Sequence, residues 1–198
     1  MYKKFLKYTI DNIFALILFI PALIVYIIIS IIIKFESKGP VFFKQKRLGK
    51  DGREFNIYKF RTMVNNAEDI GTGIFTSDVD PRITKVGHFL RKTSLDELPQ
   101  IINILKGDMS FVGPRPPVPY HPYKINEYNE FQKKRFEVRP GITGLAQVSG
   151  RNNLTWEERI NYDINYVENI NFYLDIKVIF KTLLKIFKSE DIYKKGGH

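Results

Sequence analysis

The chain has 198 residues, of which 44% are hydrophobic and 26% are charged, and its formal net charge is +10. These values are typical of a folded domain and argue against a disordered chain. Because the chain contains no cysteine, disulfide bonds and zinc–thiolate sites are excluded. The positive charge favours a polyanionic partner, and nucleic acid, anionic lipid and phosphorylated substrates all fit this description.

Residues 13–33 form a run of 21 residues without a charged side chain. This length is sufficient to cross a bilayer, because about 20 apolar residues cover about 30 Å. The apolar core is too long for a signal peptide, and no small-x-small cleavage site follows it. We therefore predict a retained membrane segment.

Pro21, near the middle of this run, bears on how the segment sits in a membrane. A helix loses a hydrogen bond and kinks at an internal proline. A simple span carries its cations on the cytoplasmic side only, but here basic residues flank both ends: Lys3, Lys4 and Lys7 before the run, and Lys34, Lys38, Lys44, Lys46 and Arg47 after it. The residues alone leave open whether the helix spans the membrane or bends and returns to the same face.

Residues 34–61 hold nine basic and three acidic residues. Aromatic and β-branched residues at 41–46 and 54–60 flank the turn sequence GKDG, which predicts a β-hairpin. Because it follows the membrane segment directly, we expect this hairpin at the headgroup level, where each Lys or Arg near anionic lipid contributes ~1 kcal/mol. An ordinary solvated basic loop is the alternative.

The second half of the chain is predicted to be mainly helical. Leu98, Ile101, Ile102 and Leu105 recur at helical spacing, and Gly107 ends that helix. Further helices are predicted at residues 123–138, 154–170 and 172–188, and loops at residues 65–82, 113–122 and 139–153. The last helix carries lysines on one face and apolar residues on the other, so it either lies on a membrane or packs its apolar face on the core.

Asp96 and Glu97 are adjacent carboxylates in the stretch TSLDELPQ, residues 93–100. Ser94 and Glu97 fit a capping box, and the helix dipole favours acids in a first turn. Pro99 complicates this interpretation, because a proline at the fifth helical position forfeits a hydrogen bond. With Pro99 at the first helical position, both acids lie just ahead of the helix. Capping explains one acid, but not two acids beside basic residues.

Arg115 lies in the segment GPRPP, where the prolines restrict the backbone and would hold the guanidinium in a fixed direction toward phosphate oxygens. No glycine fingerprint for nucleotides, P-loop or serine nucleophile motif is present. Carboxylates are therefore the best candidates for a nucleophile or a metal ligand. An ionised aspartate attacks phosphorus without a general base, and Mg²⁺ would screen the repulsion between two carboxylates and a phosphate.

Three longer runs, NIYKFRTM, DPRITKVGHFLRKTSLDELPQIINILKGDMSFVGPRP and RPGITGLAQVSGRN, resemble the bacterial sugar transferase family of monotopic phosphoglycosyl transferases. The resemblance covers nearly the whole chain. It implies transfer of a sugar-1-phosphate from a UDP-sugar to undecaprenyl phosphate at the bacterial inner membrane, with release of UMP. Downstream glycosyltransferases would then use the product.

The resemblance also implies roles for individual residues. Asp96 would attack the sugar-bearing phosphate and form a covalent phosphosugar adduct, with Glu97 as its partner. Mg²⁺ is the implied cofactor, and Asp96 is the residue that would hold it. Lys59, Arg91 and Arg115 match the family's basic residues near the phosphates.

Asp163 and Asp175 match acidic positions of the family towards the C-terminus. They are 12 residues apart, more than three helical turns, so one site is not expected to use both directly. We expect Asp175 at the active site and leave open a structural role for Asp163.

In the family the membrane segment is re-entrant, with a break at Ser-Pro and both ends cytoplasmic; here Ile20 precedes Pro21. We therefore expect a mainly α fold with a small β-hairpin, in which residues 1–34 form a re-entrant membrane helix. Residues 35–198 would form a compact phosphoglycosyl transferase domain on the cytoplasmic face, without a nucleic-acid partner. The alternative is a membrane-tethered protein whose basic hairpin binds nucleic acid or anionic lipid, and it would not need Asp96.

Overall fold

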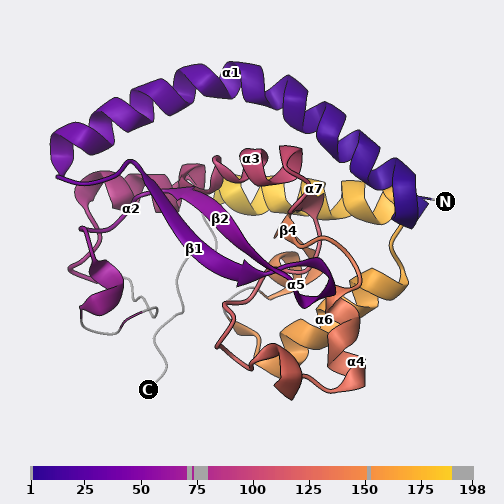
Figure 1. The fold of residues 1–198 in the computed structure, drawn as a ribbon. Coiled ribbons are helices and arrows are strands. Elements are labelled where there is room, and N and C mark those ends of the chain that lie inside the picture. Colours follow the sequence, from indigo (N-terminus) through magenta and orange to yellow (C-terminus); the bar gives the residue numbers. More distant parts are fainter. Residues whose placement is uncertain (1, 71–72, 74–79, 151–152, 189–198) are drawn as a thin grey trace.

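The computed structural model describes residues 2–70, 73, 80–150 and 153–188, and it is mostly helical with two small sheets (Figure 1). This agrees with the predicted fold class. The helices are α1 (Lys7–Glu36), α2 (Lys85–Lys92), α3 (Gln100–Leu105), α4 (Glu130–Lys133), α5 (Leu145–Ser149), α6 (Trp156–Glu168) and α7 (Phe172–Lys188). The strands are β1 (Phe42–Leu48), β2 (Glu54–Phe60), β3 (Ser110–Val112) and β4 (Gly141–Thr143).

The N-terminal helix α1 contains the predicted apolar run and extends beyond it at both ends. In the described part of the chain it is the one helix long and apolar enough to cross a membrane, judged by length and composition. Only 22% of its most apolar stretch is buried against the rest of the chain. The helix is continuous through the exposed Pro21 and arches over the domain in Figure 1.

Both ends of α1 are attached to the same body. At its start, the ammonium of Lys7 lies 2.8 Å from the carboxylate of Asp175 on α7. At its end, the carboxylate of Glu36 accepts hydrogen bonds from the Val86 amide, at 3.0 and 3.2 Å, in the first turn of α2. Between them, a stripe of buried side chains faces the domain: Ala15, Ala22, Tyr26, Ile29 and Ile33. The helix therefore lies along the domain instead of leaving it.

The predicted hairpin is confirmed. Strands β1 and β2 pair antiparallel, from Phe42 opposite Phe60 to Leu48 opposite Glu54. Asp51 and Gly52 turn the chain with φ angles of 56° and 71°, in the left-handed region that turn residues favour. The ring of Phe60 stacks on Phe42 and meets the edge of Tyr26 from α1, so the hairpin packs beneath the N-terminal helix.

A second pairing was not predicted from the sequence. Strands β3 and β4 are parallel, with Ser110 opposite Gly141. A side chain at position 141 would come within 2.1 Å of the Gly113 nitrogen, so the backbones approach closely because Gly141 has none. This contact joins the segment that carries Arg115 to the stretch that was predicted as a loop, residues 139–153.

The predicted polar helix at residues 123–138 is wrong. Asn129 starts a new helix there, because its side chain accepts the Gln132 amide at 2.9 Å, and α4 is only one turn long. A tighter 3₁₀ turn, Lys134–Phe136, follows and directs Arg135 and Phe136 into the core. Helices α6 and α7 agree with the predictions, and a capping box between Thr155 and Glu158 starts α6.

α7 does not bury its whole apolar face. Val178 is buried, with Leu174 and Ile179 partly buried beside it. Other apolar side chains on the helix remain 44–60% exposed, which the core-packing alternative does not explain: Ile176, Phe180, Leu183 and Leu184.

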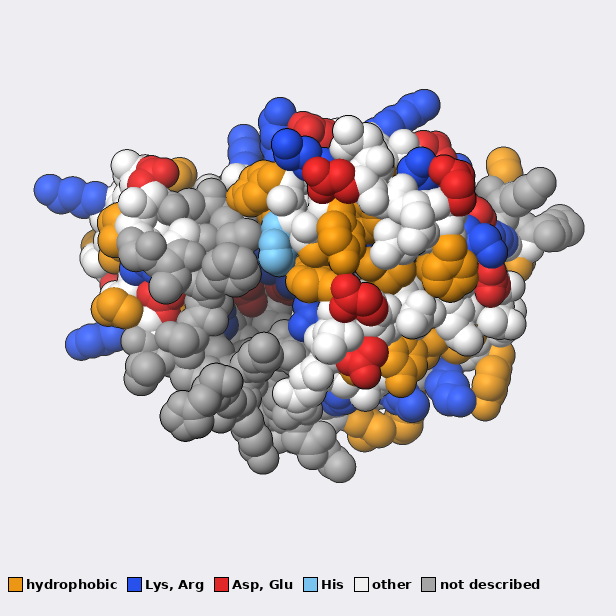
Figure 2. Space-filling view, turned by 90° about the horizontal axis from the view of Figure 1, so that it is seen from below, with side chains coloured by type: hydrophobic (Ala, Val, Ile, Leu, Met, Phe, Trp, Pro, Cys, Tyr) orange, Lys and Arg blue, Asp and Glu red, His pale blue; other side chains and the backbone are white. Residues whose placement is uncertain are grey.

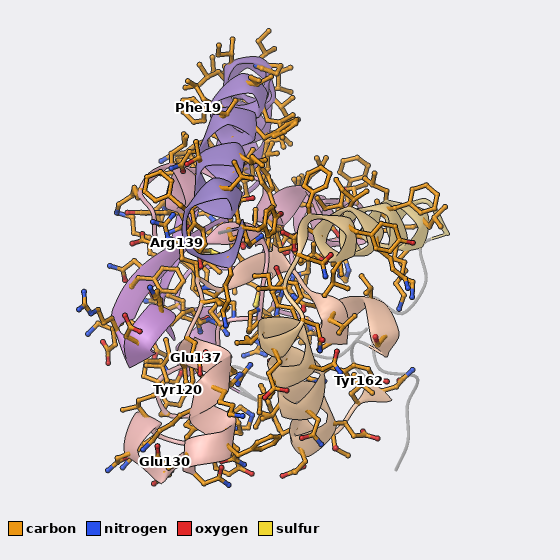
Figure 3. All side chains as sticks on the ribbon, turned by 90° about the vertical axis from the view of Figure 1, so that its right-hand side faces the viewer. Phe19, Tyr120, Glu130, Glu137, Arg139 and Tyr162 are labelled. Atoms are coloured by element: carbon orange, nitrogen blue, oxygen red, sulfur yellow. The ribbon has the colours of Figure 1, made fainter. Side chains whose placement is uncertain are left out.

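In Figure 3, Phe19 on α1 and Glu130 on α4 lie at opposite ends of the molecule. The face opposite α1 carries both acidic and basic side chains (Figure 2).

Candidate active site

The two adjacent carboxylates lie in a 3₁₀ turn, Leu95–Glu97, between α2 and α3. The predicted capping box is wrong: Ser94 precedes this turn with a φ of 57°, and its side chain makes no capping hydrogen bond. Pro99 has no N–H to donate, and α3 begins at Gln100 with Pro99 as the residue preceding the helix, although Leu98 already has helical backbone angles. Both acids thus lie ahead of the helix, as the second sequence interpretation expects.

Two cations from distant parts of the chain meet the dyad. Lys59, on β2, places its ammonium 2.6 Å from a Glu97 carboxylate oxygen and 3.7 Å from Asp96. Arg115, in the segment after β3, donates a hydrogen bond of 3.1 Å to the same Glu97 oxygen. The side chains of Asp96, Glu97 and Lys59 are 12%, 19% and 18% exposed, so their charges interact with little screening by water, whereas Arg115 is 48% exposed.

Arg91, on α2, completes the cluster. Its Nε donates a hydrogen bond of 2.9 Å to the hydroxyl of Thr62, which fixes the guanidinium. The positive charge of Arg91 is among those that lower the pKa of Asp96. The structure therefore gathers both predicted catalytic residues and the three predicted phosphate-binding residues at one site.

The two carboxylates of the dyad differ in electrostatics. Burial raises the pKa of Asp96, and the negative charge of Glu97 raises it further. The positive charge of Lys59 lowers it, but the pKa remains above its usual value. Burial acts on Glu97 too, but there Lys59 and Arg115 outweigh it and hold the pKa well below its usual range. Adjacent groups with pKa values pushed apart are suited to different roles. Glu97 is the fixed anion that holds the cations, and Asp96 is the more basic carboxylate.

A magnesium site fits this pair only in combination with a substrate. The described residues contain no group of three or more His, Asp or Glu side chains that would form a metal cage. Mg²⁺ is commonly bound by one or two carboxylates together with substrate phosphates. Because Glu97 is occupied by Lys59 and Arg115, Asp96 is the carboxylate that remains for a metal.

The two C-terminal aspartates lie in separate buried clusters. Asp163, on α6, pairs with Arg135 at 2.6 Å, and burial raises its pKa to about 6. The same Arg135 nitrogen donates to the backbone carbonyl of Arg115 at 3.1 Å, so this pair supports the Arg115 segment from behind. Nothing in the charge-rich run that contains Arg135 indicates this role, because such runs are usually solvated.

Asp175 is held at the N-terminal end of the chain. One carboxylate oxygen pairs with Lys7 and accepts a hydrogen bond of 2.6 Å from Tyr2. The other accepts a hydrogen bond of 2.6 Å from Tyr166. The contacts described for Asp175 thus attach residues 2–7 to α7, and they do not include Asp96 or Glu97.

The family profile described as "Bacterial sugar transferase" matches residues 2–189. The chain belongs to this family. The resemblance drawn from the central motif is therefore confirmed.

Similar proteins are also named as sugar transferases or for polysaccharide production. The chain is 46% identical over 162 residues to a protein of Bacillus subtilis named "Uncharacterized sugar transferase EpsL", covering 81% of this chain and 77% of the relative. It is 40% identical over 196 residues to the UDP-glucose:undecaprenyl-phosphate glucose-1-phosphate transferase of Escherichia coli, covering 96% of this chain but 42% of the relative. An exopolysaccharide production protein, ExoY of Sinorhizobium fredii, is 35% identical over 94% of this chain and 88% of its own length. The chain spans less than half of the longer relatives that it matches, as in the Escherichia coli protein.

Proposed function

We propose that this protein transfers a sugar-1-phosphate from a UDP-sugar to undecaprenyl phosphate and releases UMP. The observation that carries the proposal is the adjacent carboxylate pair Asp96 and Glu97, which Lys59 approaches at 3.7 and 2.6 Å and which Arg115 contacts at 3.1 Å through Glu97. Fixed cations suit a pyrophosphate, and the more basic carboxylate suits attack on phosphorus. The name of the Escherichia coli relative describes this reaction for glucose-1-phosphate.

In the first step, Asp96 attacks the phosphorus that bears the sugar. A new bond forms between the carboxylate oxygen and this phosphorus, and the bond from the phosphorus to the bridging oxygen breaks. UMP leaves with that electron pair, and an aspartyl phosphosugar remains. Lys59, Arg91 and Arg115 hold the donor phosphates and stabilise charge that moves onto the leaving group.

In the second step, a phosphate oxygen of undecaprenyl phosphate attacks the same phosphorus. The bond to Asp96 breaks, the free carboxylate is restored, and undecaprenyl-diphosphate-sugar is the product. Both steps use the ionised form of the attacking oxygen. Glu97 stays ionised throughout and keeps Lys59 and Arg115 in place.

Mg²⁺, if bound with the donor, would use Asp96 and phosphate oxygens and would supply neutralisation of the pyrophosphate charge. Glu97 would remain with its two cations. Among the described residues the site provides one ligand, so magnesium affinity should depend on the donor being present.

The lipid acceptor would explain why α1 and α7 expose apolar side chains. We place α1 in the bacterial inner membrane as a re-entrant helix, with the catalytic domain on the cytoplasmic face. The attachment of both ends of α1 to one domain supports this topology, since a straight span would separate them. The exposed apolar side chains of α7 would rest at the same membrane surface.

The nucleotide product tests the proposal. Purified protein is incubated with undecaprenyl phosphate and a panel of UDP-sugars, and UMP and UDP are measured separately. Release of UMP that depends on both substrates is expected for at least one donor. Release of UDP instead would identify a transferase of the sugar alone, and no nucleotide release with any donor would overturn the proposal. A basic binding protein would also give no release, but the relatives described here are named for transferase activity or polysaccharide production.

A further inference from the structure

Asn103 is a polar residue in the middle of the apolar helix α3, and its side chain is completely buried. Its neighbours Ile101 and Ile104 are buried in the main core cluster. A buried amide costs a few kcal/mol unless its hydrogen bonds are satisfied. The partners that satisfy this amide show what it does.

The Asn103 side chain is paired with the backbone of β2. Its amide nitrogen donates to the Asn56 carbonyl at 2.7 Å, and its amide oxygen accepts from the Tyr58 nitrogen at 3.0 Å. Strand β1 pairs along the other edge of β2. The two groups are alternate residues on one strand edge, so the side-chain amide takes the place that a third strand would occupy.

The Asn103 backbone holds a second segment. Its carbonyl accepts hydrogen bonds from Asp108 at 2.9 Å and Met109 at 3.2 Å, after Gly107 has turned the chain with a φ of 83°. The chain then enters β3 and continues to Arg115. Asn103 therefore contacts the strand that carries Lys59 and the segment that leads to Arg115, and it lies on the helix that directly follows the dyad.

We propose that Asn103 is a positioning residue, which holds the strand carrying Lys59 against the helix that follows Asp96 and Glu97. This inference rests on the proposed function. Lys59 follows Tyr58 directly, and its ammonium must reach Glu97 at 2.6 Å from a flexible side chain. Because a misplacement of about 1 Å can cost 10²-fold in rate, the backbone register of β2 against α3 decides whether Lys59 is productive.

The test compares two variants with a matched control. Asn103→Leu keeps the volume but removes the three side-chain hydrogen bonds, to Asn56, Tyr58 and the Asp108 carboxylate. Asn103→Asp keeps the acceptor for the Tyr58 nitrogen but loses the donors to Asn56 and Asp108. Gln100→Leu removes another buried amide of α3, whose Nε2 has no hydrogen-bond partner among the described residues. We expect Asn103→Leu to lower kcat for UMP release by about 10-fold or more, with KM within about threefold, as for a group needed mainly in the transition state. Gln100→Leu should leave both constants within about threefold.

A double-mutant cycle separates positioning from a general structural role. If Asn103 acts through Lys59, then Asn103→Leu should add less than about threefold to the loss in a Lys59→Ala background. Multiplicative losses in the double variant would overturn the inference, as would wild-type turnover by Asn103→Leu. Should Asn103→Leu fail to fold, Asn103→Asp takes its place in the same cycle.

A readout without turnover keeps this inference distinct from the proposed function. Reductive methylation of Lys59, followed by peptide mass spectrometry, reports whether its ammonium remains in the ion pair. We expect slow modification in the wild type and in Gln100→Leu, and at least about fivefold faster modification in Asn103→Leu, which corresponds to a loss of about 1 kcal/mol of protection. Unchanged modification would refute positioning by Asn103, even in a protein that released no UMP.

Discussion

At the scale of single residues, Asp96 and Glu97 show how two carboxylates with similar sequence surroundings acquire different properties. Glu97 is in direct contact with Lys59 and Arg115, whereas the Asp96 carboxylate lies 3.7 Å from Lys59. The cations therefore stabilise the charge of Glu97 most, and burial keeps Asp96 more basic. Nucleophilicity increases with basicity, so the geometry favours Asp96 as the attacking group.

Replacing Asp96 by Asn should abolish turnover and the covalent adduct, because a neutral amide is a poor nucleophile. Intact-mass spectrometry with the donor alone checks this. The wild type should gain the mass of a sugar phosphate and the variant should gain none. Glu97→Gln keeps the nucleophile and serves as the comparison: it should form the adduct slowly. Full activity of Asp96→Asn would contradict the double displacement.

Arg115→Lys keeps the charge but loses the planar fork that contacts Glu97. We expect kcat/KM to fall by ~10²-fold, by analogy with the loss of one preorganised donor at a developing charge. Arg53→Lys, at an exposed position of the hairpin, controls for the substitution itself. A loss of less than threefold, below about 1 kcal/mol, would show that Arg115 does not act in the transition state.

At the scale of elements, buried ion pairs hold the irregular segments. Asp80 and Arg82 form such a pair, with a shortest distance of 2.7 Å, and both side chains are buried. Arg82 also donates to the carbonyls of Ala67, Ile70 and Gly73, at 2.7–2.8 Å. One guanidinium therefore organises the segment that follows the hairpin.

The stability contributed by Asp80 should depend on pH. Its hydrogen bond to Arg82 lowers the pKa of Asp80 from 3.8 to about 2. Because the folded-state pKa is depressed, the contribution is present above about pH 4 and is lost as the pH falls towards 2. Asp80→Asn should thus be less stable than the wild type at pH 7, and denaturant unfolding should show the difference shrinking between pH 4 and pH 2. A difference that stays constant over this range would contradict the pair's role.

The predictability of these elements follows from the range of the interactions that form them. α1, α6, α7 and the hairpin have periodic apolar patterns, caps or turn residues, so the sequence indicates them. α2, α5, β3 and β4 are short, and β3 exists only because Ser110 meets Gly141, a contact that no local pattern encodes. At the site, Asp96, Glu97 and Arg115 stand out from their neighbours. Lys59 and Arg91 look like ordinary surface charges until the family resemblance is considered.

At the scale of the whole molecule, the arrangement of α1 decides how the enzyme meets its lipid substrate. Both ends of α1 contact the catalytic domain, and the middle of the helix arches over it (Figure 1). This middle part carries apolar side chains that are each more than half exposed: Ile17, Ile20, Ile24 and Ile27. A bilayer covering the crest would leave the domain on one side.

Cysteines placed one at a time at Lys3 and Lys38 test this topology, because the chain has no native cysteine. Exposed ion pairs such as Lys3–Glu137 contribute little, so the substitution should be tolerated. Both cysteines should resist an impermeant thiol reagent outside intact cells and react after permeabilisation, as should a Glu130→Cys control on α4. Labelling of Lys3→Cys in intact cells would show a straight span and refute the re-entrant helix.

The pairing of Lys7 with Asp175 has a consequence for biosynthesis. The two residues are separated by 168 positions, so the carboxylate that holds the start of α1 is made long after Lys7. At 5–20 residues per second, the ribosome needs roughly 8–34 s to reach it after Lys7. During that interval the pair of Lys7 with Asp175 cannot yet hold the start of α1 to the domain. Nascent chains arrested before α7 should therefore show mixed orientations of the N-terminus, which completion of the chain then resolves into one.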